Sequence, residues 1–322
     1  MSKNKWSGIS LAATSAVMIG LTPVFGKQAI QAGLPPLAVV AARTTGAALL
    51  ILLLVLVVNR RYLYIYPVGL GGCFLAGSIN GIGSLLFYSS LARIDASLAQ
   101  LLFSFYPIFV ALVLYFDGLR YRPVTLLRLG LSLPAVYLLL QASTQNIDWL
   151  GVSFALCAGL LYALHIPINQ RVLYEVPAPT VTLYTLLAMT AVVVPAYLLL
   201  SPHVPISAVS SAAWTPLLSL TVATFLSRIT LFAGVKSIGG LQTALIGLSE
   251  LLVTVALGIL WLGETLTTAQ WIGAGLLFCL LTLAGFEEPI THQPRGHGWL
   301  HWLLPPLPSA HKPATPPDHE QS

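Results

Sequence analysis

Charged residues are scarce in this sequence. Asp, Glu, Lys and Arg together make up 8% of the 322 residues, whereas 57% are hydrophobic. A soluble globular domain carries roughly 25% charged residues, and a chain so poor in charge could not cover its own surface in water. The composition therefore excludes an ordinary soluble protein and predicts an integral membrane protein that crosses the bilayer several times.

Cysteine is rare, and the familiar catalytic motifs are missing. The three cysteines, Cys73, Cys157 and Cys279, lie far apart inside apolar segments, which is neither the spacing of a metal site nor that of a disulfide framework. The sequence contains no GxSxG, no phosphate-binding loop and no HExxH, and its acidic residues do not cluster. We therefore expect no enzymatic activity, no cofactor and no metal.

Long apolar segments make up most of the chain. At roughly 20 residues per membrane span, they predict an all-α integral membrane fold of ten transmembrane helices, with the lipid bilayer as a partner. The predicted spans lie near residues 7–27, 37–58, 67–91, 96–116, 123–141, 149–170, 178–200, 212–235, 241–262 and 268–286.

The net charge of +5 comes from basic residues that stand singly or in pairs between the apolar segments. This distribution suits contact with anionic lipid headgroups and does not form a surface for nucleic acid. Alternate loops divide the basic residues unequally, with Arg60, Arg61 and Lys236 on one side of the membrane and Arg93 on the other. By the positive-inside rule, we expect a protein of the cytoplasmic (inner) membrane with both termini in the cytoplasm.

The chain repeats itself at an offset of 144 residues. Pro23 and Pro35 fall onto Pro167 and Pro179, respectively. Each copy would hold five spans, an odd number, so the second copy enters the membrane inverted relative to the first, as in many secondary transporters. The predicted units are a first repeat (1–144), a second repeat (145–286) and a cytoplasmic Pro/His-rich tail (287–322) that we expect to be disordered.

Two segments carry a resemblance to a known family. The segment "FGKQAIQAGLPPLAVVAARTTGAALL" resembles the passage from the first to the second helix of EamA-type proteins, which belong to the drug/metabolite transporter superfamily, and it includes Arg43 at a family position. The segment "LSELLVTVALGILWLGETLTTAQWIGAGLLF" is similar to the ninth and tenth helices, with the typical Gly-Glu pair at Gly263 and Glu264. The resemblance covers residues 7–286.

The sequence departs from the family pattern at two places. Residues 117–123, "DGLRYRP", stand where the first half usually repeats the Gly-Glu turn, and Leu251 stands where proline often follows the ninth-helix glutamate. The resemblance implies a ten-helix transporter of amino acids, related metabolites or drugs, usually directed outward. These motifs report the fold more than the cargo, so the substrate stays open.

A buried carboxylate in the ninth predicted span is the first candidate for function. Helical spacing places Thr243, Gly247, Glu250, Thr254 and Gly258 on one face. This small and polar face either lines a cavity in which Glu250 binds a proton or a cationic group, or forms a close contact between helices. The sequence leaves both alternatives open.

Aromatic residues stand at the equivalent positions of the first half. Phe103 and Tyr106 correspond to Gly247 and Glu250 at the offset of 144. If both faces line one cavity, one wall is aromatic and the other acidic, which suits an amphipathic small molecule. The alternative is an ordinary packed aromatic pair.

Arg228 is the second charge expected inside the membrane. It lies at about the same depth as Glu250, so the two could form an ion pair, which is how intramembrane charges are usually tolerated. Alternatively, Arg228 binds a substrate carboxylate or extends to the interface. His165, close before Pro167, either stabilises a kink or relays a proton, and Asn80 either faces a cavity or forms a hydrogen bond between helices.

Together these patterns predict a secondary transporter, a monomer or homodimer, that moves a small organic metabolite by alternating access. Export of an amino-acid-like solute or a drug, with or without coupling to protons, is the expected activity. The alternative is a membrane scaffold or sensor that acts through the tail. The candidate translocation residues are Glu250, Arg228, His165, Tyr106, Phe103, Asn80 and Thr254.

Overall fold

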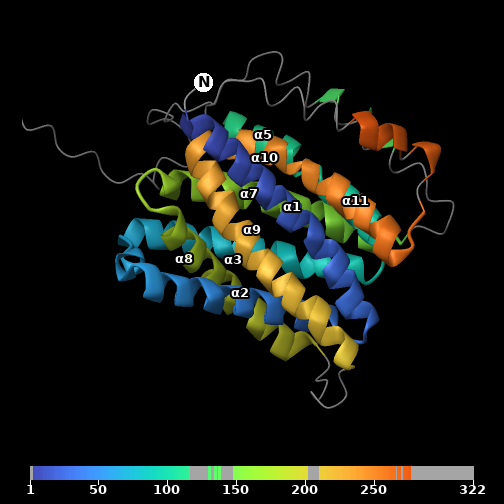
Figure 1. Ribbon diagram of the computed structural model, residues 1–322, viewed down its shortest axis with the longest axis horizontal. Coiled ribbons are helices and arrows are strands. Elements are labelled where there is room, and N and C mark those ends of the chain that lie inside the picture. Colours follow the sequence, from blue (N-terminus) through green and yellow to red (C-terminus); the bar gives the residue numbers. More distant parts are fainter. Residues whose placement is uncertain are drawn as a thin grey trace, which may run out of the picture.

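The computed structural model of the chain describes residues 3–116, 130–131, 134–135, 137–138, 148–201, 210–265, 267–269 and 271–276. In these ranges every regular element is a helix, which confirms the all-α prediction (Figure 1). The helices run roughly alongside one another, and the N-terminus lies at the upper left of the bundle (Figure 1).

Among the described residues, seven helical stretches are long and apolar enough to cross a membrane. A shorter apolar stretch, Ala96–Val110, comprises α4 (Ala96–Phe103) and the first part of α5 (Tyr106–Phe116). The predicted spans near 123–141 and 268–286 lie largely outside the described residues, so the count of ten helices stays a prediction. The seven stretches are α1 (Lys3–Gln31), α2 (Pro36–Val58), α3 (Pro67–Leu91), α7 (Trp149–Leu173), α8 (Ala178–Leu200), η3 (Ser211–Ala213) with α9 (Trp214–Ile238), and α10 (Gly240–Gly247) with α11 (Ser249–Leu262).

Two predicted spans are broken, which corrects the expectation of continuous helices near 96–116 and 241–262. In the first, α4 ends at Phe103 and α5 begins at Tyr106; in the second, α10 ends at Gly247 and α11 begins at Ser249. The boundaries of α4 and α10 lie 144 residues apart at both ends, which is the offset of the sequence repeat. The same interruption therefore occurs at the same place in both halves.

The two breaks have different local causes. Pro107 lacks the backbone N–H that would continue α4 into α5, and the Ser104 hydroxyl donates to a carbonyl one turn earlier (2.7 Å). The second half has Leu251 at the equivalent of Pro107. There the Ser249 hydroxyl donates to the carbonyl of Ile246 (2.8 Å) and satisfies an acceptor at the end of α10. The departure from the family's proline thus does not remove the break.

Helices of the first half pack extensively on helices of the second half. α1 runs along α9 and α11, α2 along α8 and α9, and α3 along α7 and α8 (Figure 1). Glycines bring these backbones close together: a Cβ on Gly77 of α3 would collide with the backbone of Thr185 in α8, and a Cβ on Gly20 of α1 would collide with the carbonyl of Glu250 in α11. Small residues at such contacts are what lets membrane helices approach closely.

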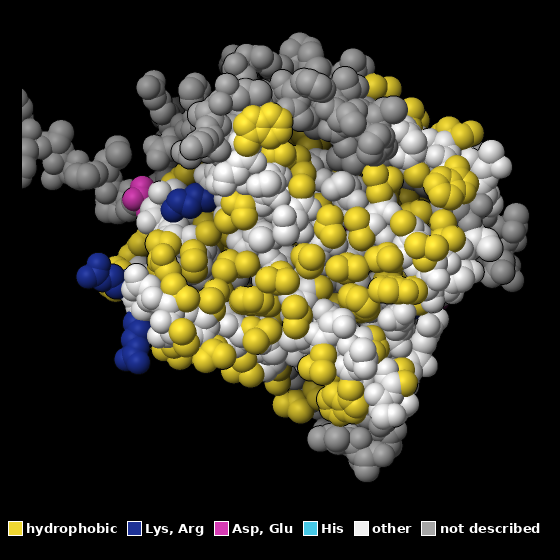
Figure 2. All heavy atoms as spheres, viewed as in Figure 1, with side chains coloured by type: hydrophobic (Ala, Val, Ile, Leu, Met, Phe, Trp, Pro, Cys, Tyr) yellow, Lys and Arg dark blue, Asp and Glu magenta, His cyan; other side chains and the backbone are white. Residues whose placement is uncertain are grey.

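The outer surface is apolar along the helices and basic at one end. Figure 2 shows apolar side chains spread over the middle of one face, whereas Lys and Arg gather at its left-hand end. The connection between α2 and α3, with the exposed Arg60 and Arg61, turns at that end (Figure 1). Large apolar side chains such as Leu53, Val57 and Leu218 are more than half exposed. This surface suits a lipid environment.

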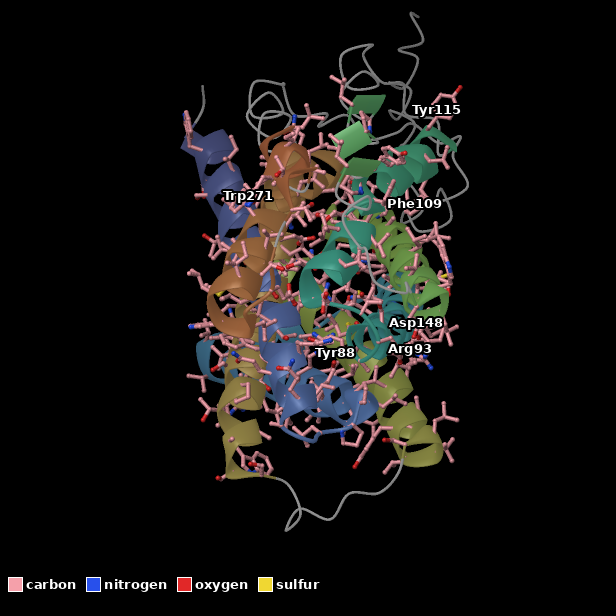
Figure 3. All side chains as sticks on the ribbon, turned by 90° about the vertical axis from the view of Figure 1, so that its right-hand side faces the viewer. Tyr88, Arg93, Phe109, Tyr115, Asp148 and Trp271 are labelled. Carbon is pink, nitrogen blue, oxygen red and sulfur yellow. The ribbon has the colours of Figure 1, made fainter. Side chains whose placement is uncertain are left out.

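At the opposite end of the bundle, a surface ion pair orders the start of α7. Asp148 accepts hydrogen bonds from the backbone N–H groups of Leu150 and Gly151 (3.0 and 3.2 Å) and so caps the helix. Arg93 donates to the same carboxylate (2.9 Å), and the two side chains lie next to each other at the edge of the bundle (Figure 3). The hydrogen bond from Arg93 holds the pKa of Asp148 below its ordinary value.

Candidate functional site

A cavity of about 50 Å³ lies inside the bundle, surrounded by residues of α1, α2, α3, α4, α7 and α9. Asn80 of α3, Tyr162 of α7 and Arg228 of α9 line it, and each lies near the middle of its helix. The cavity is therefore at the depth of the bilayer centre. Its volume accommodates a group the size of a few water molecules.

The two halves contribute equivalent positions to this cavity. Asn80 and Ser84 of α3 line one side, and Thr224 and Arg228 of α9 line the other. Each pair is separated by 144 residues, the offset of the repeat. The cavity thus lies where the corresponding helices of the two halves face each other, which is where inverted-repeat transporters hold their substrates.

Arg228 forms no ion pair with Glu250, which was one of the three alternatives that the sequence left open for it. Within the described part of the chain, the only ion pair is the one between Arg93 and Asp148. Asn80 lies beside the Arg228 guanidinium instead. With its amide oriented so that the oxygen faces Arg228, it accepts from both terminal nitrogens (3.1 Å each). The guanidinium carbon also lies 5.6 Å from the centre of the Tyr162 ring, which provides a cation–π contact. The side chain is buried, so it does not extend to the interface.

Arg43 of α2 provides a second buried cation. Its Nη1 donates to the Thr224 hydroxyl (3.2 Å), and its guanidinium carbon lies 4.7 Å from the centre of the Tyr88 ring. Among the described residues, its Nε has no hydrogen-bond acceptor. Tyr88 is buried, and Arg43 and Tyr88 both line the cavity. Arg43 therefore brings its charge to the cavity wall.

An aromatic wall completes the lining. Phe103 lies with its ring centre 5.0 Å from that of Phe87 and 4.9 Å from that of Tyr162. All three residues line the cavity. Phe103 thus belongs both to a packed aromatic cluster and to the cavity wall, so the two alternatives offered by the sequence coexist.

Glu250 lies behind the cavity lining. It is fully buried at the start of α11, and its Oε1 accepts a hydrogen bond from the Nε2 of Gln100 (3.0 Å), which does line the cavity. Its Oε2 has no hydrogen-bond donor among the described residues. A carboxyl group in this arrangement can take up a proton on Oε2 without losing its existing hydrogen bond.

The two broken helices cross-connect in a symmetric way. Gln100 of α4 donates to Glu250 of α11, and Tyr106 of α5 donates to the carbonyl of Ala244 in α10 (3.0 Å). Gln100 and Ala244 are 144 residues apart, and so are Tyr106 and Glu250. The position of Gln100 in the first half and of Ala244 in the second half therefore contacts, in each case, the position of Glu250 or Tyr106 in the opposite half. Tyr106, predicted as a cavity residue, belongs to this connection rather than to the lining.

Thr254 and His165 have structural contacts. The Thr254 hydroxyl donates to the carbonyl of Gly20 in α1 (2.7 Å), so it supports the contact between α1 and α11 and does not line the cavity. The His165 Nδ1 contacts the carbonyl of Tyr162 within α7, and its ring lies 4.6 Å from the Tyr162 ring, centre to centre. α7 continues through Pro167 without a break.

Two residues that line the cavity were not among the predicted translocation residues: Gln100, and Arg43, which the sequence placed only at a family position. Arg43 is the only charged residue between Lys27 and Arg60, and an isolated charge within a membrane span usually marks a functional position. That signal was present in the sequence. Gln100 gave no comparable signal, because its role depends on the neighbouring half of the chain.

The Gly-Glu pair of the family has a visible role at the end of α11. The Glu264 carboxylate accepts hydrogen bonds from the backbone N–H groups of Ala96 and Ser97 (3.0 and 3.2 Å) and from the Ser97 hydroxyl. It therefore caps the N-terminus of α4, where a negative charge is favourable. Gln170 of α7 provides the corresponding contact to the start of α10 in the other half (3.0 Å).

Replacing Glu264 by Ala is expected to lower the thermal unfolding midpoint of the purified protein by about 5 °C, since the lost cap is worth about 2 kcal/mol. Glu175→Ala, at an exposed acid between α7 and α8, is the matched control and should leave the midpoint near that of the wild type. The measurement is unfolding in detergent, followed by fluorescence. Equal midpoints for the two variants would contradict the capping role.

A helical membrane protein with a polar cavity at mid-bilayer depth, lined from both halves, has the architecture of a solute transporter. The comparison with known families agrees. The chain belongs to the EamA-like transporter family, whose sequence model matches it twice, over residues 6–141 and 149–286. This confirms the family resemblance seen in the sequence and identifies a multi-pass membrane protein of a transporter family.

Individual relatives are also transporters by name, and their names give no substrate. A protein of Synechocystis sp., named an uncharacterized transporter, is 28% identical over 222 residues, and the match spans 63% of this chain and 63% of the relative. Another uncharacterized transporter, from Archaeoglobus fulgidus, is 25% identical over 202 residues, or 62% of this chain and 71% of the relative. A solved crystal structure with 17% identity superposes at a TM-score of 0.66 over 86% of this chain and 96% of its own, a likeness of fold alone.

Proposed function

We propose that this protein is a secondary transporter that moves a small organic metabolite out of the cell across the cytoplasmic membrane by alternating access. The observation that carries the proposal is the cavity between α3 and α9, lined by residues 144 positions apart in the two halves. A site on such a pseudo-symmetry axis can be exposed to either side by a movement of one half against the other.

The broken helices are the elements expected to move. α4–α5 and α10–α11 are interrupted at equivalent positions. Besides the Glu264 cap, two hydrogen bonds join them, one donated by Gln100 and one by Tyr106. A few hydrogen bonds of this kind can be exchanged at modest cost. Their position beside the cavity supports a role in opening it. In the proposed topology, the two five-helix repeats are inverted in the membrane and both termini lie in the cytoplasm.

Glu250 is the proposed site of proton coupling. It is the only acidic residue in the described membrane spans, and its free Oε2 provides a place for a proton. Gln100 links its other oxygen to the cavity lining. A proton on Glu250 would therefore alter the hydrogen bonding and the charge next to the bound solute.

Counterflow in proteoliposomes tests the transport function without assuming a coupling ion. Vesicles loaded with unlabelled phenylalanine, benzoate, glucose, uridine or tetraethylammonium are diluted into the same labelled solute. We expect transient accumulation of one class of solute in vesicles that contain the protein and none in protein-free vesicles. Failure of every class to exchange would overturn the proposal and favour a scaffold or sensor, whose cellular effect would be lost on removal of residues 287–322.

A further inference from the structure

The cavity is surrounded by more positive than negative charge. Arg43 and Arg228 both line it and are only 5% and 7% exposed. Within the described membrane spans, Glu250 is the only acidic residue, and it forms no ion pair with either arginine. Charges inside a membrane protein are costly unless they are paired. The lining therefore favours a negatively charged partner.

Both guanidinium groups have unused donors. A guanidinium carries five N–H groups, yet within the described part of the chain Arg43 donates only to Thr224, and its Nε lacks an acceptor. The Arg228 guanidinium faces two side-chain acceptors, which do not use all five of its N–H groups. They are the Asn80 oxygen, in the amide orientation that satisfies both side chains, and the Tyr162 hydroxyl. Thr224 and Arg228 are one turn apart on α9, so both arginines meet on the same helix face.

We propose that the solute is an organic anion whose carboxylate lies between Arg43 and Arg228, and whose apolar part contacts the aromatic rings of Phe103 and Tyr162. This inference rests on the proposed function and names its substrate class. The planar guanidinium matches the two oxygens of a carboxylate in a way that a simple ammonium group does not. The rings offer an apolar surface directly beside the charged groups.

The size of the cavity favours a carboxylate over a bulkier phosphate ester, although both head groups suit a pair of guanidinium groups. The cavity of about 50 Å³ suits a small head group. A longer apolar part would extend along the aromatic wall formed by Phe87 and Phe103.

Binding to the purified full-length protein tests the charge of the solute directly. The probes are 3-phenylpropionate, 3-phenylpropionamide and 3-phenylpropylamine, which share an apolar part and differ in charge, together with acetate, benzoate and inorganic phosphate. Ligand binding raises the thermal midpoint by mass action. We expect stabilisation by aromatic carboxylates, with the amide and the amine binding at least about tenfold more weakly.

Variants identify the groups that hold the carboxylate. Arg43→Gln and Arg228→Gln are each expected to weaken binding of 3-phenylpropionate at least about tenfold, and Arg228→Lys less, because it keeps the charge. Arg93→Gln changes an exposed arginine of the surface ion pair and should bind like the wild type. If a cavity variant does not fold, the comparison of the probes on the wild-type protein decides.

Three results would overturn the anion inference. The first is binding of the amide or the amine as tightly as 3-phenylpropionate. The second is no stabilisation by any carboxylate, and the third is tighter binding of phosphate than of the carboxylates. Each is distinct from a failure of the transport function. Counterflow of glucose, uridine or tetraethylammonium in a protein that binds no carboxylate would refute the substrate class and leave transport standing, whereas absence of counterflow for every solute refutes transport itself.

Discussion

Proteoliposomes that contain the Glu250→Gln variant are expected to show no uptake driven by a pH gradient, down to the level of protein-free vesicles. A glutamine at this position can still accept the hydrogen bond from Gln100 through its amide oxygen, so the contact between α4 and α11 persists. It cannot bind and release a proton. Counterflow of the same solute should continue, because exchange needs no net movement of protons.

The uptake is measured with a labelled solute that shows counterflow, and a pH-sensitive dye inside the vesicles follows the protons. Glu175→Gln, which removes an exposed carboxylate between α7 and α8, is the matched control and should behave like the wild type. Proton-driven uptake that is unchanged in Glu250→Gln would exclude the coupling role. Loss of both uptake and counterflow would mean that the carboxylate serves the transport cycle as a whole.

Replacing Gly77 by Leu is expected to prevent recovery of folded protein. A Cβ at Gly77 would collide with the backbone of Thr185 and with the Cβ of Ala188 in α8. Since the obstacle is largely backbone, α3 and α8 would have to separate, and overpacking of this kind costs about 1–3 kcal/mol or more. The same separation would displace Asn80, one turn along α3, from Arg228, and removing a partner from a buried charge is itself strongly destabilising.

Gly71→Leu provides the control for this substitution on the same helix. Gly71 is exposed, and a Cβ there would meet no atom within 4 Å. The variant should therefore give the same yield of monodisperse protein in size-exclusion chromatography as the wild type, whereas Gly77→Leu should aggregate. A folded, monodisperse Gly77→Leu protein with an unchanged unfolding midpoint would show that α3 and α8 do not depend on this close contact.

The positions of the membrane helices could be predicted from the sequence because length and apolarity are local properties. The predicted spans 67–91 and 178–200 agree with α3 and α8. The breaks within the spans near 96–116 and 241–262 could not be predicted in the same way. Pro107 marks one of them, but the other depends on the Ser249 hydroxyl, and a serine in an apolar segment is equally compatible with a continuous helix.

The cavity residues were predicted only in part, for a physical reason. Depth along a helix follows from residue count, so Arg228 and Glu250 could be placed at similar heights in the membrane. The partner of each side chain depends instead on which helix lies beside it. α3 brings Asn80 to Arg228, and α4 brings Gln100 to Glu250. These contacts join distant parts of the chain and leave no periodic pattern.

Ser84 and Arg228 occupy equivalent positions of the two halves, yet they differ in size and charge. When a sequence duplicates, both copies begin with the same residue at equivalent positions, so at least one member of this pair has changed since. A cavity built from two identical halves would hold a symmetric ligand equally well in two opposite orientations. With serine on one side and arginine on the other, the charged end of an asymmetric molecule has a single preferred direction. Together with the difference between Asn80 and Thr224, this divergence makes the cavity asymmetric, so under the proposed function it would orient the transported molecule.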